Sequence, residues 1–306
     1  MIISLDQNVV SLLESSSKVN PAWAKIKALL VAGTSAGKIV CPIPYETAWE
    51  SIPLSDDRYP RIKKLQTDLS LGFSFKSYVR LLCEEVLALV RSDVDLNPFE
   101  TGNWHDFCDR FRYPAAQVGY SKMKKDVAEK MDTVPVNYEN KDLPVTKLEK
   151  LIHKKDSFDL YNNLERLKTG QALAPTCACT TDICDFLKRN NISHDKIERL
   201  KQLVLHHKYE AIPIHFYYNR LVAQLEFDLL HGGRKQKIND VDDLTRAATA
   251  LWGAKMYVCD AEVAEVCKKA KINACQSVPT VVLSARQPEL LLKHLESMIQ
   301  ASSGNE

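Results

Sequence analysis

The sequence has 306 residues, of which 45% are hydrophobic and 26% charged, and its formal net charge is +2. This composition is typical of a globular chain with one large domain or two smaller ones. No apolar stretch reaches the roughly 18 residues of a membrane-spanning helix, and the N-terminus MIISLDQNVVSLLE lacks the basic start of a signal peptide. The nine cysteines follow no regular framework, so we expect free thiols and a cytoplasmic protein without a membrane partner.

The first predicted elements are a strand, a helix and a second strand. Ile2–Leu5 is a short apolar run bounded by polar residues, which is typical of a buried parallel strand. A helical pattern covers Pro21–Ala32, and another strand-like run covers Lys38–Cys41. Alternation of this kind favours a parallel sheet whose strands are joined by helical crossovers.

The middle of the chain, residues 55–231, differs from both ends. Stretches such as SYVRLLCEEVLALVRSD and IHFYYNRLVAQLEFDLL carry apolar residues at helical spacing, and strand-like alternation is scarce. Prolines divide this region into separate helices. We therefore expect a large all-helical insertion.

The strand–helix pattern returns near the C-terminus. A predicted helix covers Val241–Leu251, and strand-like runs cover Lys255–Cys259 and Val278–Leu283. The predicted fold class is therefore α/β, with a parallel sheet flanked by helices. Its core is discontinuous and consists of residues 1–54 and 232–306, which the insertion separates.

Two acidic residues directly follow predicted strands. Asp6 comes after Ile2–Leu5, and Asp260 comes after Lys255–Cys259. In an open parallel sheet, sites form beyond the carboxyl ends of the strands. If both strands lie near the middle of the sheet, these two acids reach the same edge. Glu46 follows the second strand and reaches that edge if a helix begins near it.

Further acids stand at the start of the predicted helix Val241–Leu251. Asp240 and Asp243 are three residues apart, so they share one face of a helical first turn. The alternative is structural, because acids are favoured at helix N-termini and Asp6 could cap a helix that starts near Gln7. Caps alone would not select one edge of the sheet, however, so the joint placement favours a site.

A cluster of carboxylates matches hard divalent ions. Magnesium and manganese prefer oxygen ligands, and such an ion can activate a water and stabilise charge on a phosphoryl oxygen. The sequence predicts a site for Mg²⁺ or Mn²⁺. Its expected ligands are Asp6, Glu46, Asp240, Asp243 and Asp260.

The order of these acids resembles that in the PIN-domain nucleases. Those proteins carry an acid after the first strand, a glutamate in an early helix, and a D-x-x-x-A-A helix before a strand that ends in Asp or Asn. Here DLTRAATAL begins with Asp243, and MYVCD ends with Asp260. The resemblance covers roughly residues 1–54 and 232–306, and the long central insertion departs from the compact family pattern.

This resemblance implies a PIN-like core and a catalytic, metal-binding role for Asp6, Glu46, Asp243 and Asp260. Asp240 becomes an added or substitute ligand. Asn8 takes the polar position two residues after the first acid, where it would contact nucleic acid. The implied activity is hydrolysis of phosphodiester bonds by an endoribonuclease, and the preference for RNA over DNA rests on the family alone.

Two basic stretches could contact the phosphates of a nucleic acid. One is HGGRKQK, directly before the acidic NDVDD, and the other is SKMKKDVAEK within the insertion. A solvated surface is the ordinary explanation of such runs. The candidate contacts are Arg234, Lys235, Lys237, Lys122, Lys124 and Lys125.

The sequence supports two functional hypotheses. The first is a metal-dependent PIN-like nuclease. The second is a catalytically inactive PIN-like module that binds protein or RNA, with the insertion as a possible docking surface for a protein partner and the acids as caps and solubilising groups.

Overall fold

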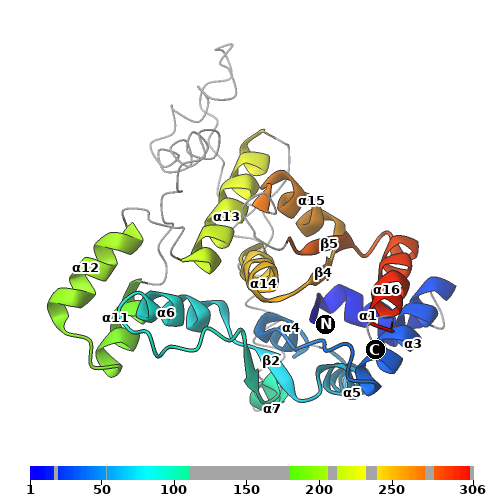
Figure 1. Ribbon diagram of the computed structural model, residues 1–306. Helices are drawn as coiled ribbons and strands as arrows, with labels where there is room; N and C mark the ends of the chain where they lie inside the picture. Colours follow the sequence, from blue (N-terminus) through cyan, green and yellow to red (C-terminus); the bar gives the residue numbers. More distant parts are fainter. Residues whose placement is uncertain are drawn as a thin grey trace, which may run out of the picture. The chain divides into compact units, whose positions relative to one another are not determined.

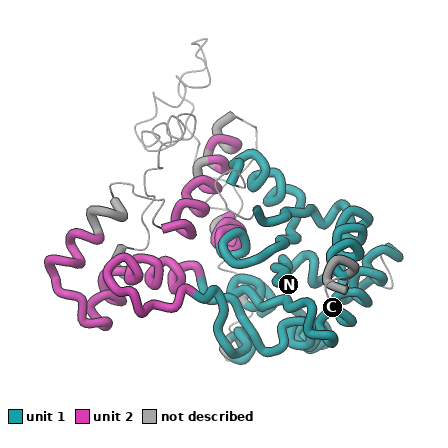
Figure 2. Tube along the Cα trace, in the orientation of Figure 1, with its two compact units in different colours: residues 1–77, 97–121, 249–306 teal, residues 78–96, 122–248 magenta. Residues whose placement is uncertain are grey.

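Figure 1 shows the computed structural model of the protein. It describes residues 1–16, 20–52, 54–109, 180–205, 212–231, 240–272 and 279–303. The chain forms two compact units, coloured in Figure 2. Unit 1 consists of residues 1–77, 97–121 and 249–306, and unit 2 of residues 78–96 and 122–248. The expected insertion with ends at residues 55 and 231 stays a prediction.

Unit 1 contains a three-stranded parallel sheet in the order β1 (Ile3–Leu5), β4 (Met256–Cys259), β5 (Val281–Ser284). Strands β1 and β4 pair from Ile3 opposite Met256, and β4 pairs with β5 in the same direction. The predicted mixed α/β class with a parallel sheet is confirmed. All four residues of β4 are buried, which explains why its sequence is a continuous apolar run.

The strand predicted at Lys38–Cys41 is wrong in its extent. Val40 forms only an isolated parallel bridge with Ile2. The N–H of Cys41 donates to the carbonyl of Leu69 at 2.8 Å. The N–H of Cys41 therefore bonds to a helix residue and not to the first strand, and the pairing stops after one bridge.

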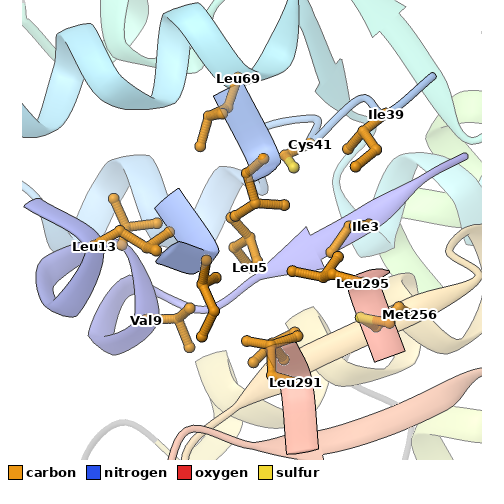
Figure 3. Packing of buried hydrophobic residues seen from close by; sticks show 14 of the residues in the cluster. Ile3, Leu5, Val9, Leu13, Ile39, Cys41, Leu69, Met256, Leu291 and Leu295 are labelled. Carbon is orange, nitrogen blue, oxygen red and sulfur yellow. The ribbon is translucent and has the colours of Figure 1, made fainter. Parts of the chain in front are cut away.

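Helices cover the sheet of unit 1 and enclose its main core. Alternate residues of the strands, such as Leu5 and Met256, face a cluster that also holds Leu13 and Leu291 from flanking helices (Figure 3). Helix α15 (Ala261–Lys269) packs against β4 and β5. The helices that contribute to the main core are α1 (Gln7–Glu14), α3 (Pro21–Ser35), α5 (Tyr59–Ser70) and α16 (Pro288–Ser303).

Local sequence signals explain where α3 begins. Asn20 is its N-cap, and the side chain of Asn20 accepts a hydrogen bond from the N–H of Ala22 at 2.8 Å. Pro21 occupies the first helical position, where its missing N–H leaves no bond unmade. The predicted helix Pro21–Ala32 is therefore confirmed, with one further turn at its C-terminal end.

The expectation that residues 55–231 are all-helical is wrong. Strands β2 (Phe73–Phe75) and β3 (Phe99–Thr101) form an antiparallel pair in unit 1. The rings of Phe75 and Phe99 pack across this pair with their centroids 5.2 Å apart. Each strand has only three residues, too few for the alternating pattern that identifies a strand in sequence. Unit 1 also contains two short helices, α4 (Tyr45–Glu50) and α7 (Trp104–Cys108).

The described part of unit 2 is helical. Helix α6 packs against α11 and α13, and α11 packs against α12. Buried polar contacts support these helices: the Tyr78 hydroxyl lies 3.0 Å from Nδ1 of His215, and the Glu85 carboxylate accepts from the N–H of Ile214 at 3.0 Å. The helices are α6 (Tyr78–Ala88), α11 (Thr180–Arg189), α12 (His194–Leu205), α13 (Pro213–His231) and the beginning of α14 (Asp240–Gly253).

None of the helices within the described ranges combines the length and apolar character needed to cross a membrane. The cytoplasmic location expected from the sequence stays a prediction.

Candidate functional site

Asp6 and Asp260 lie together at the carboxyl ends of two neighbouring strands. Leu5 is paired with Val258, and the N–H of Asp6 donates to the carbonyl of Val258 at 3.0 Å. The Oδ2 atom of Asp6 accepts a hydrogen bond from the N–H of Asp260 at 3.3 Å. Parallel pairing of β1 with β4 thus brings together two acids that are 254 positions apart in the chain.

The two acids differ in what their side chains do locally. Asp6 is the N-cap residue of α1, yet its side chain makes no capping hydrogen bond. Only 1% of Asp6 is exposed. Asp260 caps α15, because its Oδ1 accepts from the N–H groups of Glu262 and Val263 at 2.8 and 2.9 Å. Helix capping therefore explains the position of one carboxylate oxygen of Asp260. It does not explain the carboxylate of Asp6.

Gln7 is a residue that the sequence analysis did not select. It directly follows Asp6, only 8% of it is exposed, and neither polar atom of its amide has a hydrogen-bond partner among the residues that the structure describes. A buried amide without partners is uncommon and costs about 1–3 kcal/mol. The sequence feature that could have identified Gln7 is its position directly after Asp6. The sequence alone could not show that Gln7 is buried.

Glu46 and Asn8 belong to helices of the same unit. Glu46 is in the first turn of α4 and is 8% exposed. Asn8 is exposed on α1, and α1 and α4 contact each other. The structure therefore places Glu46 near the start of a helix after Pro44, as the sequence predicts.

Asp240 and Asp243 belong to unit 2. Helix α14 begins at Asp240, which is buried, one residue earlier than predicted. Asp243 forms an ion pair with Arg246, and the Arg246 side chain is 1% exposed. Asp243 thus has a structural role in balancing a buried guanidinium group. Because these two acids lie in the second unit, the convergence of all five acids stays a prediction.

The predicted basic contacts lie outside the described residues, namely Arg234, Lys235, Lys237, Lys122, Lys124 and Lys125. A different cation, Arg286, lies near the carboxylate edge. It lines a hollow of about 460 Å³ together with Asp260, Ala261 and Glu262. The sequence feature that could have identified Arg286 is its position after a predicted strand, which places it at the same sheet edge as Asp6 and Asp260.

The chemistry of the carboxylates suits a magnesium-type ion. Mg²⁺ keeps several waters and is usually held by one or two carboxylates together with substrate phosphates, and Asp6 and Asp260 provide two carboxylates. In the part of the chain that the structure describes, no group of three or more His, Cys, Asp or Glu side chains is placed so that it could hold a metal ion. A site built on this pair would therefore depend on water and substrate for its remaining ligands.

Cys267, on the same helix as Asp260, is a buried free thiol. Burial and, to a smaller extent, the negative charge of Asp260 together raise the pKa of Cys267 to about 12. The thiol is therefore protonated at neutral pH, and it is a poor metal ligand or nucleophile.

No protein-family model matches the chain, and comparisons with curated protein sequences and with solved structures also give no match.

Proposed function

We propose that the protein is a metal-dependent nuclease with a PIN-like core that hydrolyses phosphodiester bonds, with RNA as the expected substrate. The observation that carries the proposal is the pair formed by Asp6 and Asp260 at the carboxyl ends of adjacent parallel strands. Asp6 is buried there without acting as a helix cap. Sites in open parallel sheets form at this edge.

In the proposed site, Asp6 and Asp260 hold Mg²⁺ or Mn²⁺. Glu46, Asp240 and Asp243 are the further ligands that the family resemblance implies. When bound, an ion of this type lowers the pKa of a water and stabilises negative charge on phosphoryl oxygens. The preference for RNA follows from the resemblance to PIN-domain nucleases, not from any contact of the chain.

The surrounding backbone would hold both carboxylates in place. Asp260 is fixed by two N–H groups of α15, which leave Oδ2 to face a ligand. Asp6 is oriented by the N–H of Asp260. Carboxylates fixed in this way lose little freedom when a ligand binds, which favours binding. The buried amide of Gln7 would serve as a donor to a substrate oxygen.

A second candidate function is an inactive binding module. It is favoured by the structural roles of Asp260 as a cap and of Asp243 as the partner of Arg246. In that case the acids stabilise helices and no metal-dependent reaction occurs. Substitution of Asp6, which caps nothing, separates the two functions most cleanly.

The test is a cleavage assay on single-stranded RNA and single-stranded DNA with Mn²⁺ or with EDTA. We expect wild-type cleavage with Mn²⁺ only, and a loss of at least about 100-fold in Asp6→Asn, because removing one ligand weakens both binding and orientation of the ion. Asp68→Asn is the matched control, since Asp68 is an exposed partner of Lys64 on α5. Absence of cleavage under every condition, or equal activity of Asp6→Asn, would favour the binding module.

A further inference from the structure

A second hollow in unit 1 lies along α15 and the edge strand β5, which are neighbours in Figure 1. Its volume is about 490 Å³. Ala261, Ala264 and Lys268 line it at spacings of three and four residues, which places them on one face of α15. Lys271, two residues after the end of this helix, also lines the hollow. The small alanine side chains leave the hollow open on this face. We call this hollow the α15–β5 groove.

The groove has an excess of positive charge. Lys268, Lys271 and Arg286 line it and are exposed. Within the described residues, none of these three side chains forms an ion pair or a hydrogen bond. The acid in the lining is Glu265, and its carboxylate is 3.9 Å from Nζ of Lys269. Unpaired cations around a concave surface attract anions, since a hollow focuses their field.

Neutral donors also lie on the outer edge of β5, beside the groove. The N–H of Val281 donates to the carbonyl of Lys255, directly before β4, and the N–H of Ala285 donates to the carbonyl of Cys259 in β4. Donors alternate along a parallel strand, so the N–H groups of Val282 and Ser284 point to the other side of β5. Both residues line the groove. The Ser284 hydroxyl oxygen accepts from the N–H of Arg286 at 3.2 Å, so its O–H remains available to donate. Backbone and hydroxyl donors of this kind commonly bind phosphate oxygens.

The groove adjoins the proposed metal site. It shares Ala261 and Arg286 with the hollow that Asp260 lines. A ligand that follows the groove therefore arrives beside the Asp260 carboxylate. The helix dipole explains only part of this positive charge. Lys268 is in the last turn of α15, where a positive charge complements the helix dipole. Arg286 lies after β5, so the dipole of α15 does not account for it.

We propose that the α15–β5 groove binds phosphate groups through Lys268, Lys271, Arg286 and the donors of β5. A single-stranded polynucleotide backbone and a free nucleotide both carry this chemistry. The role of the groove in guiding a substrate rests on the proposed nuclease function, whereas phosphate binding itself does not need the metal.

The test measures binding without cleavage. Fluorescence anisotropy of a labelled 12-residue oligouridylate is recorded in EDTA at 50 and 200 mM salt. The variant Lys268→Gln/Lys271→Gln/Arg286→Gln removes the three cations. The matched control Lys25→Gln/Lys255→Gln/Lys293→Gln removes three exposed lysines outside the groove. Thermal unfolding verifies that both variants are folded.

We expect the groove variant to bind at least about 100-fold more weakly than wild type at 50 mM salt, and the control within about twofold. Each contact with a single strand contributes about 0.7 to the salt slope. Loss of three contacts should therefore reduce the slope by about 2. Between 50 and 200 mM salt, wild type should lose about 20-fold more affinity than the groove variant.

Competition identifies the source of the phosphate. If the groove binds a polynucleotide, unlabelled 12-mer should displace the labelled oligouridylate at far lower concentrations than ATP does. If it binds a single nucleotide, the two competitors should act at similar concentrations. Equal affinity and salt slope of wild type and groove variant, or no binding of any probe, would overturn the proposal. Because the assay contains EDTA, a failed nuclease hypothesis leaves this result unchanged: cleavage can be absent while binding depends on the groove.

Discussion

At the scale of single residues, Asp6 and Asp260 show how one residue type serves different purposes after equivalent strands. Asp260 uses Oδ1 to satisfy two N–H groups of α15. Asp6 stands before α1 in the same way but caps nothing. A helix cap can be recognised in sequence by residue type and position, but whether the side chain actually caps depends on the orientation that packing gives it.

This difference predicts the stability of two variants of Asp260. Asp260→Ala removes both capping bonds and should lower the free energy of unfolding by about 1 kcal/mol. Asp260→Asn should remain within a few tenths of a kcal/mol of wild type, because asparagine is an equally good cap. Urea denaturation measures both values. Equal stability of the alanine variant and wild type would show that the cap does not contribute.

A second group of residues stabilises unit 1 away from the proposed site. The Tyr59 hydroxyl donates to Asp109 at 2.5 Å and lies 3.3 Å from Nδ1 of the fully buried His105. Lys63 forms ion pairs with Asp109 and Asp106 at 2.7 and 2.9 Å. Partial burial acts to raise the pKa of Asp109, but the bonds from Lys63 and Tyr59 outweigh it and lower this pKa.

The lowered pKa of Asp109 predicts a pH-dependent contribution to stability. A carboxylate whose pKa is lower in the folded state stabilises the fold above its unfolded pKa, about 3.9, and this stabilisation disappears as the pH falls through the folded value. Asp109→Asn should therefore be less stable than wild type by about 1 kcal/mol at pH 7, a modest value because the group is partly exposed. Urea denaturation from pH 7 to pH 3 should show the difference shrinking below about pH 4. A difference that stays constant over this range would contradict the assignment.

At the scale of elements, the sequence predicts those whose residues are buried in a periodic pattern. Strands β1, β4 and β5 and helix α3 agree with the prediction within a few residues, because burial on the sheet or on one helical face selects apolar residues at fixed spacing. The extent of the strand predicted at Lys38–Cys41 is wrong, and the pair β2–β3 was not predicted. Their pairing depends on distant backbone groups, such as the carbonyl of Leu69 for Cys41, which leave no local pattern.

Gly33 illustrates a contact between elements that constrains α3. A Cβ atom added to Gly33 would lie 2.5 Å from Cδ1 of Ile39. Alanine usually stabilises a helix interior by up to about 1 kcal/mol relative to glycine. At this position we expect the clash to dominate, and Gly33→Ala should destabilise the protein by about 1–3 kcal/mol.

The control for Gly33→Ala is a double-mutant cycle with Ile39→Val, which removes Cδ1. Ile39→Val alone should cost about 0.5–1.5 kcal/mol. The double variant should lose less stability than the sum of the two single changes, because the shorter valine side chain relieves part of the clash. Additive losses would show that the two side chains do not interfere.

At the scale of the whole molecule, the proposed site depends on the pairing of the first strand with one near the C-terminus. From the sequence, the rule that strand ends share a sheet edge was sufficient to predict that Asp6 and Asp260 meet. The sequence could not predict that the Gln7 amide is buried without a hydrogen-bond partner in the described part of the chain, or that three cations line the α15–β5 groove. Those features arise from packing between elements and not from any local spacing of residue types.

The central claim, that Asp6 and Asp260 share a divalent ion, is tested most directly by thermal and urea unfolding with and without Mn²⁺. A ligand at a hundredfold excess over its Kd stabilises the folded state by about 2.7 kcal/mol. Wild type and the Asp68→Asn control should show such an increase. Asp6→Asn and Asp260→Asn should show little or none, although the latter keeps its helix cap and its stability without metal. Equal stabilisation of all four proteins by Mn²⁺, or none in wild type at millimolar Mn²⁺, would contradict the claim.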